Sequence, residues 1–211
     1  MNIVQDATQA ALPGTAKQFL GTVQPRPLMQ SIMYVAILGV LGIIGTVIGL
    51  SVIGVCFWTV CFKWPITWSL VSGIIGWLGT IVSVVGAGMI VSALSQGMVG
   101  RLVSNEESVT MAALAATPVL LAGILNIIPG IGGIIIFLAW IYAAVLYYLG
   151  STVRFGQDKA IVVTIIYIIM GIVISMVFGL ISAAVYSPGL FAGGASSLGG
   201  YGTYGGGYYG F

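Results

Sequence analysis

Side chains that usually perform catalysis are scarce in this chain, and their spacing matches few known kinds of site. The sequence has no histidine, which removes the commonest general base and a frequent ligand of metals and haem. Of its four acidic residues, only Glu106 and Glu107 are adjacent, and the solvated start of a helix explains this pair better than an active site does. Ser104 stands three residues before Glu107, which is the pattern of a helix capping box.

Cys56 and Cys61 have a C-x4-C spacing, which matches neither a redox-active pair nor a zinc site. A disulfide and two separate apolar thiols both agree with this spacing, and we favour the separate thiols. Gly73, Gly76 and Gly79 lie within an apolar segment, which is not typical of a phosphate-binding loop. We therefore expect a protein that is not an enzyme and that has no catalytic residue, cofactor or metal.

The composition indicates a chain that lies in a membrane. Hydrophobic residues make up 59% of the sequence, charged residues make up 5%, and the mean hydropathy is +1.16. Soluble domains carry about 25% charged residues. The charges leave four neutral runs, each longer than the roughly 20 residues that a helix needs to cross a bilayer; these runs are 27–62, 64–100, 108–153 and 160–211. The sequence therefore predicts an all-α fold, a polytopic transmembrane helical bundle.

We predict five spans, because the run 108–153 is too long for one helix. The spans cover about residues 29–54, 66–97, 109–128, 132–153 and 160–186. A cytoplasmic N-terminal segment (1–28) precedes this five-helix transmembrane domain (29–187), and an extracytoplasmic tail (188–211) follows it.

The basic residues predict the orientation, because loops rich in lysine and arginine stay in the cytoplasm. With the N-terminus inside, the outer segments hold only Lys63 and the inner segments hold Lys17, Arg26, Arg101, Arg154 and Lys159. We therefore place the N-terminus inside, the C-terminus outside and the protein in a plasma membrane. Because these charges serve topology, we expect no nucleic-acid partner.

Two prolines interrupt the run 108–153. Pro129 ends one helix, and Gly130 turns the chain back. Pro118 lies midway along the preceding span, where it removes a backbone donor, crowds the carbonyl of Leu114 and kinks the helix. Hydroxyls such as that of Thr117 can satisfy the freed groups. We interpret this bend as a packing feature.

Small residues fill the predicted spans. Gly45 and Gly49 form a G-x-x-x-G pattern, which lets helices approach closely in lipid, so we assign them to packing. No ionisable residue falls inside a predicted span, which argues against ion-coupled transport.

The two ends of the chain differ in character. Residues 1–12 have no basic start and no apolar core, so we expect no signal peptide. Thr15 is a candidate cap for a short amphipathic helix on the cytoplasmic membrane surface, or alternatively for a partner-binding helix; its apolar face holds Ala16, Phe19, Leu20 and Val23. The glycine-rich tail is either a spacer or a docking segment, whose aromatic residues are Tyr201, Tyr204, Tyr208, Tyr209 and Phe211.

The segment "VTMAALAATPVLLAGIL", a proline-glycine break and then "IYAAVLYYLG" resemble the Yip (Ypt-interacting protein) domain family. The resemblance covers about residues 105 to 185 and implies five spans, a cytoplasmic N-terminus and a proline in the third span, where Pro118 stands. Eukaryotic members are linked to Rab-type GTPases, vesicle trafficking and membrane shaping. This chain has "VQPRPLMQ" where they carry an acidic D-L-x-G-P-type segment, so we expect no GTPase binding and a similarity to shorter archaeal or bacterial members.

Two functions agree with these observations. We favour a non-enzymatic, Yip-like integral membrane protein that acts as an interaction or scaffold protein, or as an accessory subunit of a larger membrane complex. Its partners would be the lipid bilayer and other membrane protein subunits, or further copies of the chain through self-association. The alternative is a transporter or channel for a neutral or lipid-like solute. A continuous polar path through the bundle would favour transport, and an apolar face covered by other chains would favour the subunit.

Overall fold

The computed structural model describes residues 3–57, 60–100, 102–128 and 131–186, and most of these residues are helical. The helices are α1 (Ile3–Ala11), α2 (Pro13–Thr22), α3 (Leu28–Val47), α4 (Ile66–Val99), α5 (Asn105–Ala115), α6 (Thr117–Ala122), α7 (Ile131–Phe155) and α8 (Gln157–Tyr186). A π-helical turn, η1 (Ile48–Ile53), continues α3, and a 3-10 segment, η2 (Gly123–Ile127), continues α6. Between α3 and α4, β1 (Val55–Phe57) and β2 (Val60–Phe62) form an antiparallel hairpin.

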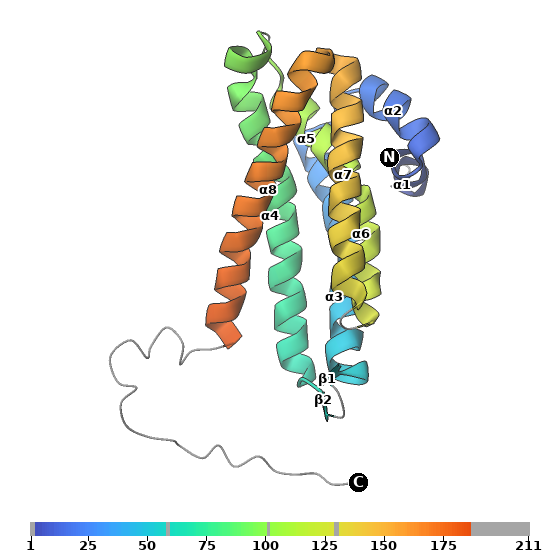
Figure 1. Cartoon of the computed structure of the whole chain (residues 1–211), viewed down its shortest axis with the longest axis vertical. Helices are drawn as coiled ribbons and strands as arrows, with labels where there is room; N and C mark the ends of the chain where they lie inside the picture. The colour runs from blue at the N-terminus through green and yellow to red at the C-terminus, as the bar shows by residue number, and fades with distance from the viewer. Residues whose placement is uncertain (1–2, 58–59, 101, 129–130, 187–211) are drawn as a thin grey trace, which may run out of the picture.

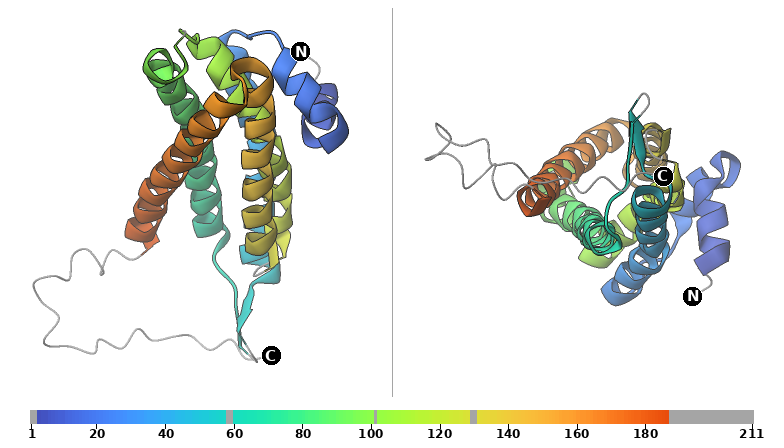
Figure 2. Two further views of the ribbon diagram at one scale, coloured as in Figure 1. Left: turned by 45° about the horizontal axis from the view of Figure 1, so that its top comes forward. Right: turned by 90° about the horizontal axis from the view of Figure 1, so that it is seen from below.

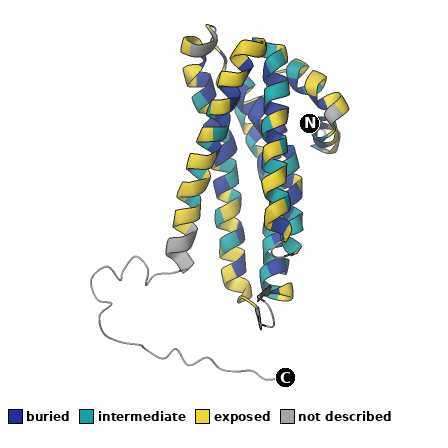
Figure 3. Ribbon diagram, in the orientation of Figure 1, coloured by how far each residue is buried: buried dark blue, intermediate teal, exposed yellow. Residues whose placement is uncertain are grey.

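Four of these helices are long and apolar enough to cross a membrane. They cover Leu28–Ile53, Ile66–Gly97, Ile131–Phe155 and Gln157–Ile181. A fifth crossing results if α5 and the α6–η2 segment, which meet at an angle of 42°, count as one bent span. Many large apolar residues of the long helices are exposed, and Figure 3 shows exposed residues along the outward faces of these helices. These features indicate a membrane-embedded protein.

The helices form an elongated bundle with two distinct ends (Figure 1). The hairpin end carries β1 and β2, and the amino-terminal end carries α1, α2, the start of α5 and the junction of α7 with α8. Helix α4 packs along both α8 and α3, while α7 packs against α8, α6 and α2. Toward the hairpin end α8 diverges from α7 (Figures 1 and 2), whereas α4 stays in contact with the end of α3, since Ser51 of η1 donates to Ser69 of α4 at 2.7 Å.

Helix α2 packs against the protein, which corrects the prediction that its apolar face lies on the membrane surface. Ala16 and Leu20 are fully buried, and Gly150 of α7 lets the side chain of Leu20 approach closely. The helix begins at Pro13, whose fixed φ suits a first turn, and Leu12 is its cap. Thr15 is not the cap, because its hydroxyl donates to the backbone carbonyls of Gln9 and Leu12.

Two arginines attach this amino-terminal segment to the bundle. Arg26 donates two hydrogen bonds to Asp6 on α1, at 2.8 and 2.9 Å. Arg154 on α7 donates to Glu107 of α5 at 2.9 Å and to the backbone carbonyls of Leu20 and Val23. Side chains that the sequence assigns to topology alone therefore also hold α1 and α2 in place.

The glycines of α3 and η1 form a shallow face, the glycine face, that receives the backbone of η2. A Cβ atom at Gly45 would collide with the carbonyl oxygens of Gly123 and Ile124, and one at Gly49 would collide with the carbonyl oxygen of Asn126. Gly42 touches Gly123 across the same contact. The G-x-x-x-G pattern therefore packs against the second half of the bent span, and not against another regular helix.

This contact predicts that a single methyl group at position 49 destabilises the fold. Gly49→Ala forces its Cβ into the backbone of η2, and overpacking of this kind costs about 1–3 kcal/mol. Gly133→Ala is the matched control, because its Cβ would meet no atom within 4 Å. Thermal unfolding in detergent, followed by circular dichroism, should show a lower midpoint for Gly49→Ala alone. Equal midpoints for the two variants would contradict the close contact.

Candidate functional site

Two adjoining cavities lie between the helices in the half of the bundle nearer the hairpin. The α4–α8 cavity has a volume of about 220 Å³ and is bounded by α4, α6, α7 and α8. The α3–α4 cavity has a volume of about 190 Å³ and is bounded by α3, α4, α6, η2 and α7. The two cavities share four lining residues, which are Gly76, Thr80, Val119 and Trp140. The two cavities therefore lie side by side, and together we call them the interhelical site.

The interhelical site exists because α4 presents small residues to it. Eight residues of α4 line the two cavities; two of them are the larger Trp77 and Val84, and the other six are Ser72, Gly73, Gly76, Gly79, Thr80 and Ser83. A Cβ atom at Gly76 would meet nothing within 4 Å, whereas one at Gly79 would lie 2.9 Å from the ring of Phe178. Side chains of α8 therefore fill the space beside Gly79, and the space beside Gly76 stays open.

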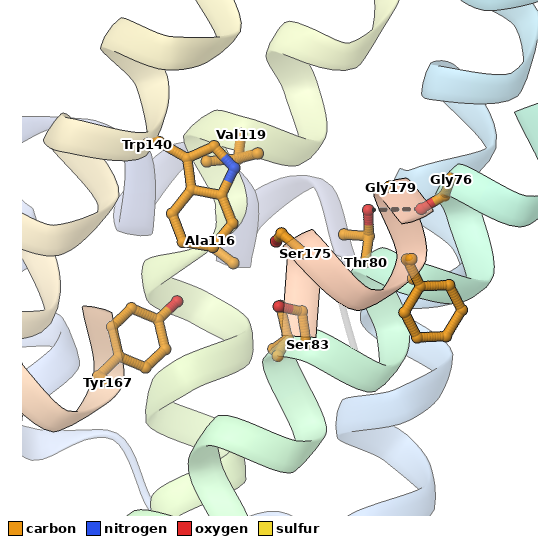
Figure 4. Close-up of a pocket in the computed structure, with 12 residues that line it drawn as sticks. Gly76, Thr80, Ser83, Ala116, Val119, Trp140, Tyr167, Ser175 and Gly179 are labelled. Carbon is orange, nitrogen blue, oxygen red and sulfur yellow. Dashed lines mark hydrogen bonds between the residues drawn. The ribbon is translucent and has the colours of Figure 1, made fainter. Parts of the chain in front are cut away.

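The lining is polar but uncharged. Hydroxyl groups come from α3, α4 and α8, an amide comes from Asn126, and none of the described residues that line the two cavities is charged. Thr80 donates to the carbonyl of Gly76 at 2.9 Å (Figure 4), and Ser83 donates to the carbonyl of Gly171 at 3.3 Å. The amide of Asn126 lies 3.5 Å from the hydroxyl of Thr46.

An apolar groove on the outside of the bundle adjoins the interhelical site. It runs between α7 and α8, has a volume of about 510 Å³ and is lined mainly by large apolar side chains, including Phe137, Ile141, Ile168, Ile172 and Met176. The groove shares Trp140 and Ser175 with the α4–α8 cavity.

Trp140 lies where the groove and both cavities meet. Its indole packs on Gly171 of α8, where a Cβ atom would lie 3.0 Å from the ring. Figure 4 shows its side chain beside Ala116 and Val119, with Tyr167 and Ser175 on other sides of the cavity. The indole N–H and these two hydroxyls are groups that can donate hydrogen bonds to a bound molecule.

Toward the amino-terminal end a packed core closes the interhelical site. Val35, Val84, Ala116 and Leu120 are buried there and belong to one hydrophobic cluster. Deeper in this cluster, the rings of Tyr147 and Tyr167 stack with centroids 4.1 Å apart and planes 6° from parallel. The interhelical site is therefore a recess that opens sideways, and the core separates it from the amino-terminal end.

Hydroxyl groups hold the bend beside this core. Thr117 donates to the carbonyl of Leu114 at 2.6 Å, in place of the N–H that Pro118 lacks. Because the single hydroxyl hydrogen of Thr117 is used there, the 2.7 Å contact with Tyr34 must have the tyrosine as donor. Near the amino-terminal end, Thr110 accepts from the backbone N–H of Arg26 and lies 3.1 Å from the hydroxyl of Ser31.

The packing residues Gly45, Gly49 and Pro118 do not line this site, whereas Gly73, Gly76 and Gly79 do. Gly45 and Gly49 are in the contact with η2, and Pro118 follows the 42° bend at Ala116. Pro129, Gly130 and the aromatic tail residues lie outside the described residues. Sequence reasoning missed Trp140 and the uncharged recess. The available signal was the recurrence of small residues every four positions on two helices, namely Ser72, Gly76 and Thr80, and Gly171, Ser175 and Gly179.

Comparisons of this chain with protein-family models, curated proteins and solved structures give no match. Among the described residues, no group of three or more acidic or cysteine side chains is placed to hold a metal ion. The function must therefore be argued from the shape and the chemistry of the recess and the groove.

The buried hydroxyls yield a paired prediction. Tyr34→Phe removes the donor to Thr117 and should lower the free energy of unfolding by about 0.5–1.5 kcal/mol. Tyr147→Phe should leave stability unchanged or raise it, because the Tyr147 hydroxyl is buried and has no hydrogen-bond partner within the described part of the chain. Thermal unfolding of both variants in one detergent tests this order. A larger loss for Tyr147→Phe would refute it.

Proposed function

We propose that this protein is a non-enzymatic, multi-pass membrane protein that binds a neutral lipid-like molecule between its helices. The observation that carries the proposal is that Trp140 and Ser175 line both an uncharged, hydroxyl-bearing recess and an apolar groove on the outside of the bundle. A molecule with a small polar head and a hydrocarbon chain has the same two-part chemistry.

The lining favours a neutral head group. Moving an ionised group away from water is costly unless an opposite charge pairs with it, and the lining residues of the recess carry no charge. An alcohol or ester head can instead accept hydrogen bonds from the indole of Trp140 and from the hydroxyls of Tyr167 and Ser175. The groove offers apolar contacts for the chain, such as those of Ile168 and Ile172.

The closed core favours binding over conduction. A channel for a neutral solute needs a polar path from one end of the bundle to the other, and buried apolar residues such as Val84 and Leu120 lie between the recess and the amino-terminal end. Passage across the membrane would require these helices to separate. We therefore propose a protein that binds and presents a lipid-like molecule laterally, within the bilayer.

The Yip-like interaction or scaffold function, including service as an accessory subunit, is the competing proposal. The resemblance of residues 105 to 185 supports it, and so does the count of five crossings when the bent pair is one span. The distribution of basic residues supports a plasma-membrane protein with its N-terminus inside and its C-terminus outside, and the resemblance also implies a cytoplasmic N-terminus. In that orientation Arg26 and Arg154 lie on the inner side and Lys63, next to the hairpin, lies on the outer side.

Photolabelling tests the lipid proposal. A photoactivatable diacylglycerol should label residues of α7 and α8 in the purified full chain, and unlabelled diacylglycerol should compete. Gly76→Leu fills the recess and should lower this labelling at least several-fold, whereas Gly133→Leu, at an open glycine outside the lining, should not. Mass spectrometry of cross-linked peptides is the measurement. Equal labelling of both variants would refute the lipid site, and a stoichiometric protein partner recovered with both would favour the scaffold.

Orientation is tested with single cysteines in a chain that carries Cys56→Ser and Cys61→Ser. Lys63→Cys and Gln157→Cys place the probes at exposed positions, one beside the hairpin and one at the α7–α8 junction. A membrane-impermeant maleimide applied to intact cells should modify the cysteine at position 63 and spare the one at 157. Modification of both from outside would contradict the proposed topology.

A further inference from the structure

The hairpin at the end of the bundle places both cysteines of the chain opposite each other. The register of β1 and β2 pairs Val55 with Phe62, Cys56 with Cys61, and Phe57 with Val60. The sequence contains two cysteines in total, so each has the other as its only possible partner within one chain.

The backbone of such a pair has the dimensions of a disulfide. Residues directly opposite each other in an antiparallel pair have Cα atoms about 4.5–5.5 Å apart. A disulfide requires Cα atoms about 4.4–6.8 Å apart, so either type of antiparallel pair satisfies it. The sequence spacing alone favours two separate thiols, and the register reverses that preference.

A hairpin of this length needs additional support. Each strand has three residues, and an isolated two-stranded hairpin is marginally stable in water. Its base is held where the backbone N–H of Trp64 donates to the carbonyl of Leu50 at 3.1 Å, and where Gly54 adopts a φ of 85° that favours glycine. A covalent link at the middle pair would fix the register along the remaining length.

The position of the hairpin agrees with an oxidising environment. The hairpin lies at one end of the bundle, and Arg26 and Arg154 lie at the other. The distribution of basic residues places the hairpin end outside the cytoplasm. Disulfides form and persist outside the cytoplasm.

We propose that Cys56 and Cys61 form an intramolecular disulfide across the hairpin. The two thiols lose two protons and two electrons as the sulfur–sulfur bond forms. The acceptor is the disulfide of an extracytoplasmic thiol oxidase, which takes up both and leaves as a dithiol. This proposal does not depend on the lipid site.

Thiol counting in the full chain tests the proposal. Cells that express the protein are quenched with acid to prevent later oxidation, and the denatured chain is alkylated with N-ethylmaleimide before or after reduction by a phosphine. Intact-mass measurement should find no adduct without reduction and two adducts after it. Two adducts without reduction would overturn the disulfide.

Single substitutions supply the controls. Cys56→Ser and Cys61→Ser each leave one thiol, and each variant should gain one adduct without reduction. A non-reducing gel should show the unsubstituted protein as a monomer. A dimer that dissociates on reduction would place the bond between two chains and would overturn the cross-strand pairing.

Discussion

The missing backbone hydrogen of Pro118 is the constraint on which the arrangement of the bundle depends. Because Pro118 cannot donate to the carbonyl of Leu114, the hydroxyl of Thr117 donates to it, and Tyr34 on α3 donates to that hydroxyl in turn. The bend of 42° is therefore tied to α3 by hydrogen bonds at its centre. Beyond the bend, η2 lies against the glycine face of α3 and η1, where Gly45 and Gly49 allow its backbone to approach. The bend brings η2 to this face, and the glycines leave room for its backbone.

Charged and uncharged polar groups lie in different parts of this protein. Among the described residues, every charged side chain except that of Lys63, beside the hairpin, occurs at the amino-terminal end, where Arg26 pairs with Asp6 and Arg154 pairs with Glu107 and two backbone carbonyls. Between the long helices the polar groups are hydroxyls, indoles and one amide, which can enter hydrocarbon at lower cost than an ion. A molecule that enters from the bilayer therefore meets neutral donors and acceptors. Because the recess is lined by neutral polar groups, acid–base pairs in the sequence do not indicate its position.

The sequence allows the architecture to be predicted further than the site. Neutral runs of sufficient length predict the long helices, because crossing a bilayer demands apolar residues in sequence-local stretches. The position of the bend also follows from local chemistry at Pro118. The docking of α2 could not be predicted, since an apolar face of Ala16 and Leu20 looks the same whether lipid or α7 covers it. The recess was missed for a related reason: Trp140 and Tyr167 are separated along the chain, and only tertiary packing brings them to one cavity.

Glycines in this bundle serve two different structural purposes. The atoms around each glycine show which purpose it serves. In lipid, helices gain little from burying apolar area against each other, so small residues contribute mainly by allowing close contact. Gly45 and Gly49 do this, because backbone occupies the place of their missing side chains. Gly76 and Gly179 both line the recess, and a Cβ atom at either would meet nothing within 4 Å. A glycine in a helix lowers the stability of that helix. Where no other helix packs against the glycine, no close helix contact offsets this loss. The presence of such a glycine on a recess wall is accounted for when a molecule from the bilayer, rather than another helix, occupies the space.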